Sequence, residues 1–173
     1  LDLYAVSVED GRRRDVYHEE YPTWVEWIDG MIFTDKGLYM ARNFETGWQQ
    51  IYFLSYGGTL RRLTEGENWD ISLLKADEKK GNLWFTAKRD SASILRSTGL
   101  TAQGRVTALT DPDYCVRAVK FSEDGKTFTA DISNAREPWR GIEGRTDRYS
   151  CKVVTDTSTV DLSSRPSPQI VKI

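Results

Sequence analysis

Histidine and cysteine are scarce in this 173-residue chain, and their scarcity excludes several kinds of catalytic site. There is one histidine, His18, and there are two cysteines, Cys115 and Cys151. A serine hydrolase needs a histidine base and commonly a G-x-S-x-G turn for its nucleophile, and the sequence contains no such turn motif. The sequence also contains no cysteine–histidine cluster for zinc and no Walker loop for phosphate. We therefore expect no self-contained catalytic triad, no catalytic residue, no bound metal and no cofactor.

Long apolar runs and an excess of basic charge are also absent. No run approaches the roughly 18 apolar residues of a membrane-spanning helix, so no membrane span is expected. The net charge is −2, and no basic stripe stands out, which makes nucleic acid an unexpected partner. The chain begins at Leu1 without a methionine and without a visible signal peptide. We expect it to be an internal piece of a longer protein, whose compartment the missing leader does not reveal.

What the sequence does contain is a repeat that is marked by glycines. Short segments with similar residue types begin at intervals of 44 to 47 residues: GRRRDVY, GTLRRLT and GRVTALT begin at Gly11, Gly58 and Gly104, and GLYMAR, GNLWFTAKR and GKTFTADIS begin at Gly37, Gly81 and Gly125. A four-stranded unit that repeats every ~40–50 residues is typical of a β-propeller blade. The alternative is chance spacing among the 13 glycines of a generic all-β chain.

The repeat predicts an all-β fold, a partial β-propeller of about three to four blades, each a four-stranded antiparallel sheet. The expected blade units are residues 1–21 (partial), 22–64, 65–111 and 112–162, followed by an exit linker over 163–173. Residues 23–28 (TWVEWI) alternate with period two and predict the first strand of the second unit. Residues 133–148 have no period and predict a loop. A closed propeller has no open side, so we expect the missing blades to be partners, and open blade edges to favour homo-oligomers.

Cysteines and aromatic residues each leave two interpretations open. Cys115 and Cys151 could form a bridge, although two separate buried thiols are the preferred interpretation. The six tryptophans are expected to pack between β-layers, and a sugar-binding aromatic platform is the alternative. His18 and the run RRR (12–14) are both expected to lie on the solvated surface of an outer strand.

Several segments in order resemble the propeller of the dipeptidyl peptidase IV family of serine peptidases. These are LYAVSVEDGRRRDVYHEEYPTWVEWID, GWQQIYFLSYGGTLRRLTEGENWDI, DEKKGNLWFTAKRDS, FSEDGKTFTADIS and VTDTSTVDL, which together cover roughly residues 1–133 and 150–173. The resemblance implies a parent enzyme with an N-terminal propeller and a C-terminal hydrolase domain that carries a Ser-His-Asp triad. That parent would remove dipeptides from peptide substrates in the periplasm or outside the cell. Residues 134–149 depart from the family pattern.

The resemblance also points to substrate-binding residues. The connector matched by Trp24–Asp29 can present side chains to the internal cavity in the family, which makes Trp27, Ile28 and Asp29 candidates for binding the substrate. Plain core packing is the alternative for these residues. The family also uses paired glutamates, but in an earlier helical stretch, so Glu19 and Glu20 are expected to be a solvated strand end.

Two functions of different classes follow. The first is a non-catalytic propeller segment that gates and positions the substrate of a dipeptidyl peptidase IV-like exopeptidase. The second is a stand-alone propeller that binds carbohydrate or protein, with no peptidase attached.

Overall fold

A computed structural model describes residues 1–23, 25–28, 30–89, 92–100, 105–156, 162 and 164–166. These residues form fourteen β-strands in four sheets and no helix, so no part of the described chain is a helix that could span a membrane. Sheet I contains β1 (Asp2–Val6) and β2 (Arg13–His18). Sheet II contains β3 (Ile32–Phe33), β4 (Gly37–Arg42), β5 (Gln50–Ser55) and β6 (Leu60–Arg62).

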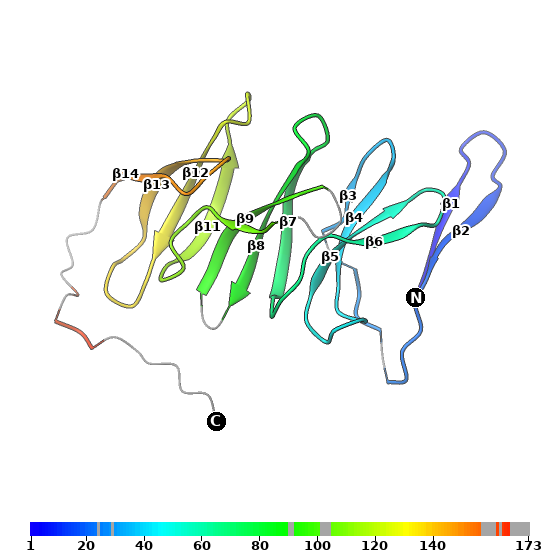
Figure 1. The fold of residues 1–173 in the computed structure, drawn as a ribbon, viewed down its shortest axis with the longest axis horizontal. Helices are drawn as coiled ribbons and strands as arrows, with labels where there is room; N and C mark the ends of the chain where they lie inside the picture. Colours follow the sequence, from blue (N-terminus) through cyan, green and yellow to red (C-terminus); the bar gives the residue numbers. More distant parts are fainter. Residues whose placement is uncertain are drawn as a thin grey trace.

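The last two sheets repeat the plan of sheet II. Sheet III contains β7 (Trp69–Asp77), β8 (Asn82–Arg89), β9 (Ala92–Gly99) and β10 (Thr107–Ala108), and sheet IV contains β11 (Cys115–Phe121), β12 (Thr127–Ser133), β13 (Arg140–Arg145) and β14 (Cys151–Thr155). In each sheet every strand pairs antiparallel with the next strand along the chain. The sheets stand side by side in chain order (Figure 1).

This arrangement confirms the predicted fold of a partial β-propeller with four-stranded blades. The second strands of sheets II, III and IV begin at residues 37, 82 and 127, so each begins 45 residues after the one before. The glycine landmarks differ in local conformation, however. Gly81 and Gly125 have positive φ, whereas Gly37 does not and instead lies where an added Cβ would meet the Leu54 carbonyl oxygen at 2.2 Å.

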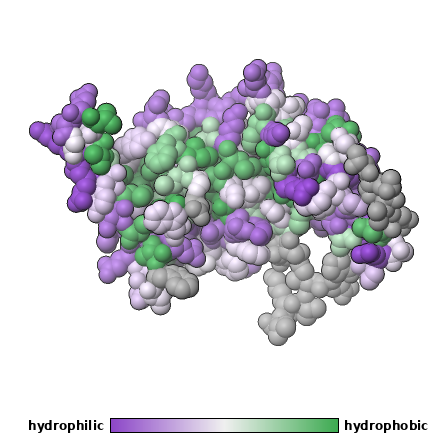
Figure 2. Space-filling model, turned by 180° about the vertical axis from the view of Figure 1, so that it is seen from behind, coloured by the Kyte–Doolittle hydropathy of each residue, from purple (hydrophilic) through white to green (hydrophobic). Residues whose placement is uncertain are grey.

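Side chains along the central strands point alternately to the two faces of their sheet. A separate hydrophobic core therefore lies between each pair of neighbouring sheets. Along β4, Leu38 and Met40 pack towards sheet I, while Tyr39 packs towards sheet III. Along β8, Phe85 faces sheet II and Trp84 faces sheet IV, where its indole Nε1–H donates to the Thr146 carbonyl at 3.0 Å. Because successive side chains of a strand point to opposite faces, a strand that is buried on both faces links two cores. Seen from behind, hydrophobic side chains form a band across the middle of the row of sheets (Figure 2).

The repeated Leu-Thr pair has a structural explanation. Leu63 and Leu109 are fully buried and donate their backbone N–H to the third strand of their sheet, at Ile51 and Leu95. The threonine that follows each leucine, Thr64 or Thr110, accepts the backbone N–H of that same third-strand residue through its hydroxyl. The pair therefore continues the pairing beyond the short outer strands β6 and β10.

Two sequence predictions about strands were wrong. Residues 23 and 25–28 form no strand, and the first strand of sheet II is only Ile32–Phe33. Residues 133–148, predicted as a loop, contain β13. Glycine usually weakens a strand, but Gly144 lies opposite Phe128, whose ring carbon would be 2.5 Å from an added Cβ. The missing side chain therefore makes room for the aromatic ring that covers this position.

Candidate functional site

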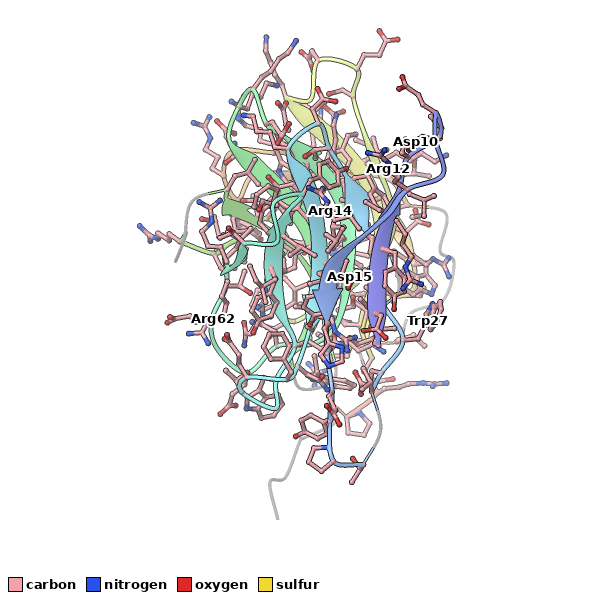
Figure 3. The ribbon with its side chains drawn as sticks, turned by 90° about the vertical axis from the view of Figure 1, so that its right-hand side faces the viewer. Asp10, Arg12, Arg14, Asp15, Trp27 and Arg62 are labelled. Atoms are coloured by element: carbon pink, nitrogen blue, oxygen red, sulfur yellow. The ribbon has the colours of Figure 1, made fainter. Side chains whose placement is uncertain are left out.

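The candidate site is the connector of residues 19–31, which joins sheet I to sheet II. In the described part of the connector, Ile28 is only 5% exposed and packs in the core between these sheets with Val16 and Met40. Trp27 is 78% exposed, the largest exposed fraction of any described tryptophan. Figure 3 places Trp27 near the end of β2 that is opposite Asp10 and Arg12. Asp29 and Trp24 lie outside the described residues.

The structure therefore separates Trp27 from Ile28, the two predicted site residues that it describes. Ile28 is a core residue, as the packing interpretation expected, and it anchors the connector. Trp27 is available to a ligand, and its large apolar surface is turned outward.

A buried arginine holds the connector in place. The Arg42 guanidinium donates to both carboxylate oxygens of Glu19, from Nε at 2.8 Å and from Nη2 at 2.5 Å. Its third nitrogen, Nη1, donates to the Glu26 backbone carbonyl at 2.9 Å. The Tyr17 hydroxyl donates to Glu19 at 2.5 Å. We call these four residues, Tyr17, Glu19, Glu26 and Arg42, the Arg42 clasp.

The electrostatics of the Arg42 clasp favour the ionised pair. The side chains of Arg42 and Glu19 are 1% and 6% exposed. Burial by itself would raise the pKa of Glu19, but the hydrogen bonds from Arg42 and Tyr17 outweigh it and hold that pKa below its ordinary value. Burial, together with the nearby Glu19 carboxylate, raises the pKa of the Tyr17 hydroxyl, which therefore stays protonated and donates.

The prediction of a solvated strand end was wrong for Glu19. Its two oxygens are occupied by Arg42 and Tyr17, so it has little capacity left for a ligand. Glu20 is exposed, as expected. The sequence contained one signal of this network, because Arg42 is the only charge in the otherwise apolar strand GLYMAR. Its partner lies 23 residues away, and no local pattern identifies it.

Nothing in the described structure assembles a catalytic centre. His18 is 69% exposed, as predicted, and its Nδ1 lies 2.7 Å from Asp2, so it has no serine partner in the described structure. No group of three or more His, Cys, Asp or Glu side chains in the described ranges could hold a metal ion. Cys115 and Cys151 lie on opposite edge strands of sheet IV and form no disulfide with each other, which agrees with the interpretation as separate thiols, although both are half-buried and not fully buried.

Exposed tryptophans extend beyond the connector. Trp48, Trp69 and Trp139 are 42%, 42% and 38% exposed, whereas Trp84 is buried between sheets III and IV. Trp69 is the first residue of β7, and Trp48 and Trp139 come just before β5 and β13. These are first or third strands of their sheets, and first and third strands of a meander run in the same direction. Trp27 precedes the first strand of sheet II. The topology therefore places the four tryptophans along one rim of the row of sheets.

Comparison with known proteins identifies the family of this chain. The family model for the dipeptidyl peptidase IV (DPP IV) N-terminal region matches residues 1–139. The chain belongs to this family. The match confirms the resemblance seen in the sequence and includes the connector, the Arg42 clasp and sheets I to III.

Solved structures of other propellers resemble this family member in fold. TolB from Acinetobacter baumannii superimposes with a TM-score of 0.59 at 17% identity over 91% of this chain, and a putative TolB from Agrobacterium tumefaciens with a TM-score of 0.57 at 18% identity over 90%. This chain spans only 38% and 55% of the length of those two chains. At such identities the likeness concerns the fold alone.

Proposed function

We propose that this chain is a non-catalytic propeller segment of a dipeptidyl peptidase IV-like serine exopeptidase, in which it gates and positions a peptide substrate. Membership of the DPP IV N-terminal region family is the observation that carries this proposal. The chain has one histidine, which is exposed and bonded to Asp2, so the triad would be supplied by a hydrolase domain elsewhere in the longer protein. The partners would then be that domain, the remaining blades and the peptide. The protein would work in the periplasm or outside the cell.

Within this proposal the connector contacts the substrate. Trp27 supplies an exposed aromatic surface on which a peptide side chain could be buried, and Asp29 is the second candidate contact. Ile28 and the Arg42 clasp keep the connector fixed, so that little conformational entropy is lost when the substrate binds. The expected role is binding and orientation, with no proton transfer from this chain.

The test has two parts. The chain by itself should release no chromophore from a chromogenic Gly-Pro dipeptide substrate, whereas the complete protein should release it and should be blocked by a serine-peptidase inhibitor. In the complete protein, Trp27→Ala should raise KM several-fold with little change in kcat, because a binding contact is lost and the chemistry is not. Trp48→Ala, an exposed tryptophan outside the connector, is the matched control. A complete protein without dipeptidyl peptidase activity would contradict the proposal.

The row of exposed tryptophans favours a second candidate, a propeller module that binds carbohydrate or protein. Aromatic surfaces on one rim could serve several successive units of an extended ligand. The flanking coding sequence separates the two functions, because only the peptidase requires a downstream hydrolase domain with a G-x-S-x-G turn. In a binding module, Trp48→Ala should reduce the affinity for the ligand as much as Trp27→Ala does.

A further inference from the structure

The two strands of sheet I correspond to the third and fourth strands of sheet II. The turn between β1 and β2 contains Gly11 with a φ of 69°, and the turn between β5 and β6 contains Gly58 with a φ of 88°. In both turns the glycine N–H donates to the carbonyl of a serine, Ser7 at 3.0 Å or Ser55 at 2.9 Å. The N–H of each serine donates back across the turn at 2.9 Å. Sheet I is therefore built as the second half of a four-stranded sheet.

The outer face of sheet I exposes residues whose counterparts in sheet II are buried. The strand pair nearest the turn contains Val6 in sheet I and Leu54 in sheet II, and two residues earlier along these strands lie Tyr4 and Tyr52. Leu54 and Tyr52 are 1% and 0% exposed, because they pack in the core between sheets I and II. Val6 and Tyr4 are 60% and 43% exposed, although the Arg13 guanidinium lies over the Tyr4 ring at 4.0 Å. In the described structure sheet I stands at the end of the row, with no sheet on this face (Figure 1).

The edge of β1 is open where each other third strand has a neighbour. In sheet II the third strand, β5, pairs with β4 over six residues, from Gly37 opposite Ser55 to Arg42 opposite Gln50. The third strands β9 and β13 pair with β8 and β12 in the same way. Among the described residues β1 pairs with β2 alone, so the backbone groups on its other edge have no strand partner. Such an edge is a template for an added strand.

The repeat also shows what kind of strand fits this edge. A second strand is apolar on both faces, as in β4, where Leu38 and Met40 pack on one side and Tyr39 on the other. A second copy of this chain cannot supply such a strand, because β4, β8 and β12 are each paired on both edges. The partner that fits is therefore a separate hairpin with the chemistry of β3 and β4.

We infer that the β1 edge is a docking surface for a β-hairpin whose second strand is apolar on both faces and pairs antiparallel with β1. The hairpin would complete sheet I as a four-stranded sheet. By the register of sheet II, the residue in the place of Met40 would lie opposite Tyr4, and the residue in the place of Leu38 would lie opposite Val6. This inference concerns the completion of the fold and does not depend on the proposed peptidase role.

The chain's own first hairpin provides the probe. A synthetic peptide of residues 30–44, GMIFTDKGLYMARNF, contains β3 and β4. Added to the isotope-labelled full chain, it should bind saturably in a one-to-one complex, shift the NMR signals of the β1 amides and slow their hydrogen exchange. A control peptide with Leu38→Lys and Met40→Lys should bind at least ten-fold more weakly, because it places charges beside Tyr4 and Val6.

Three results would overturn the inference. The first is the absence of saturable binding, or equal binding of the two peptides. The second is a set of shifts that centres on β2 or β14, the other outer strands at the two ends of the row. The third is a change in the β1 signals that follows the concentration of the chain and not that of the peptide, which would place a second copy at this edge.

Two variants of the chain locate the docking surface. Val6→Lys places an ammonium group beside the added strand, so we expect at least a ten-fold loss of affinity for the peptide of residues 30–44. Val154→Lys is the matched control, because Val154 is 49% exposed on β14, an edge strand at the other end of the row. If Val6→Lys disturbs the fold by circular dichroism, the comparison of the two peptides on the unchanged chain decides. Undiminished binding by a folded Val6→Lys variant, or an equal loss with Val154→Lys, would contradict the assignment.

Discussion

At the scale of single residues, one ion pair differs from the others that the structure describes. Arg42 and Glu19 are almost completely buried, whereas pairs such as Arg12 with Asp10 and Lys126 with Asp124 are largely exposed. Exposed pairs contribute little to stability, since water and salt screen them. A buried pair is different, because removal of one partner leaves an uncompensated charge in a low-dielectric core.

Arg42→Met should therefore destabilise the chain by about 3–5 kcal/mol, measured as the free energy of unfolding in urea at neutral pH. Part of this cost is the unpaired Glu19 carboxylate, so adding Glu19→Gln to Arg42→Met should restore some of the stability. The pKa of Glu19 is lowered from 4.5, so its contribution is present above that pH and is lost as the pH falls through the lower folded value. If the two substitutions changed the free energy of unfolding by strictly additive amounts, Arg42 and Glu19 would not be coupled as the Arg42 clasp requires.

His18 gives a second prediction at this scale. It is the only histidine, and its hydrogen bond to Asp2 raises its pKa above 6.5, while the same bond lowers the pKa of Asp2 below 3.8. The pair should contribute to stability between these two values, with the contribution lost as the pH rises through the folded pKa of His18 or falls through that of Asp2. Asp2→Asn should move the NMR titration midpoint of the single imidazole downward. An unchanged midpoint would show that the bond is not populated in solution.

At the scale of elements, the repeat predicted strands well. The repeated segments GLYMAR, NLWFTAKR and TFTADIS each form the second strand of a four-stranded sheet. The pattern failed where a distant residue decides the structure. Residues 25–28 alternate like a strand, but the Glu26 carbonyl is bonded to Arg42 from another strand, and Ile28 is drawn into the core. β13 was missed because its glycines are explained only by the residues opposite them, Phe128 and Thr155.

Gly144 in β13 gives the prediction at this scale. A Cβ at this position would lie 2.5 Å from a Phe128 ring carbon and 2.9 Å from the Cys151 sulfur. Gly144→Ala should therefore destabilise the chain by about 1–3 kcal/mol, seen as a lower midpoint in thermal unfolding. Phe128→Leu provides room for the new Cβ and should make the alanine less costly. The double variant should therefore lose less stability than the sum of the losses measured for the two single variants. Gly47→Ala, where no atom lies within 4 Å, tests the effect of positive φ alone.

At the scale of the whole molecule, the two end sheets differ in the faces that they turn outward. The outer face of sheet IV carries an Arg117–Asp131 pair at 3.5 Å and a Lys152–Glu143 pair at 3.5 Å, and Arg117 also covers the Trp139 ring. Sheet I has only two strands, and its outer face exposes Tyr4 and Val6, because Leu3 and Ala5 point into the core. In Figure 2, hydrophobic atoms adjoin hydrophilic ones at the end formed by sheet I.

Self-association should therefore occur through sheet I rather than through sheet IV. The two strands of sheet I leave unpaired backbone groups on both edges, and Val6 is 60% exposed beside them. Light scattering of the isolated chain should show dimers or larger species as its concentration rises. Val6→Lys should shift it towards the monomer, because a charge on an edge strand opposes pairing. Thr129→Lys, on the exposed polar face of sheet IV, is the matched control and should leave association unchanged. Two results would show that the open end of sheet I does not drive assembly. The first is a chain that stays monomeric at high concentration, and the second is a Thr129→Lys variant that dissociates as much as Val6→Lys does.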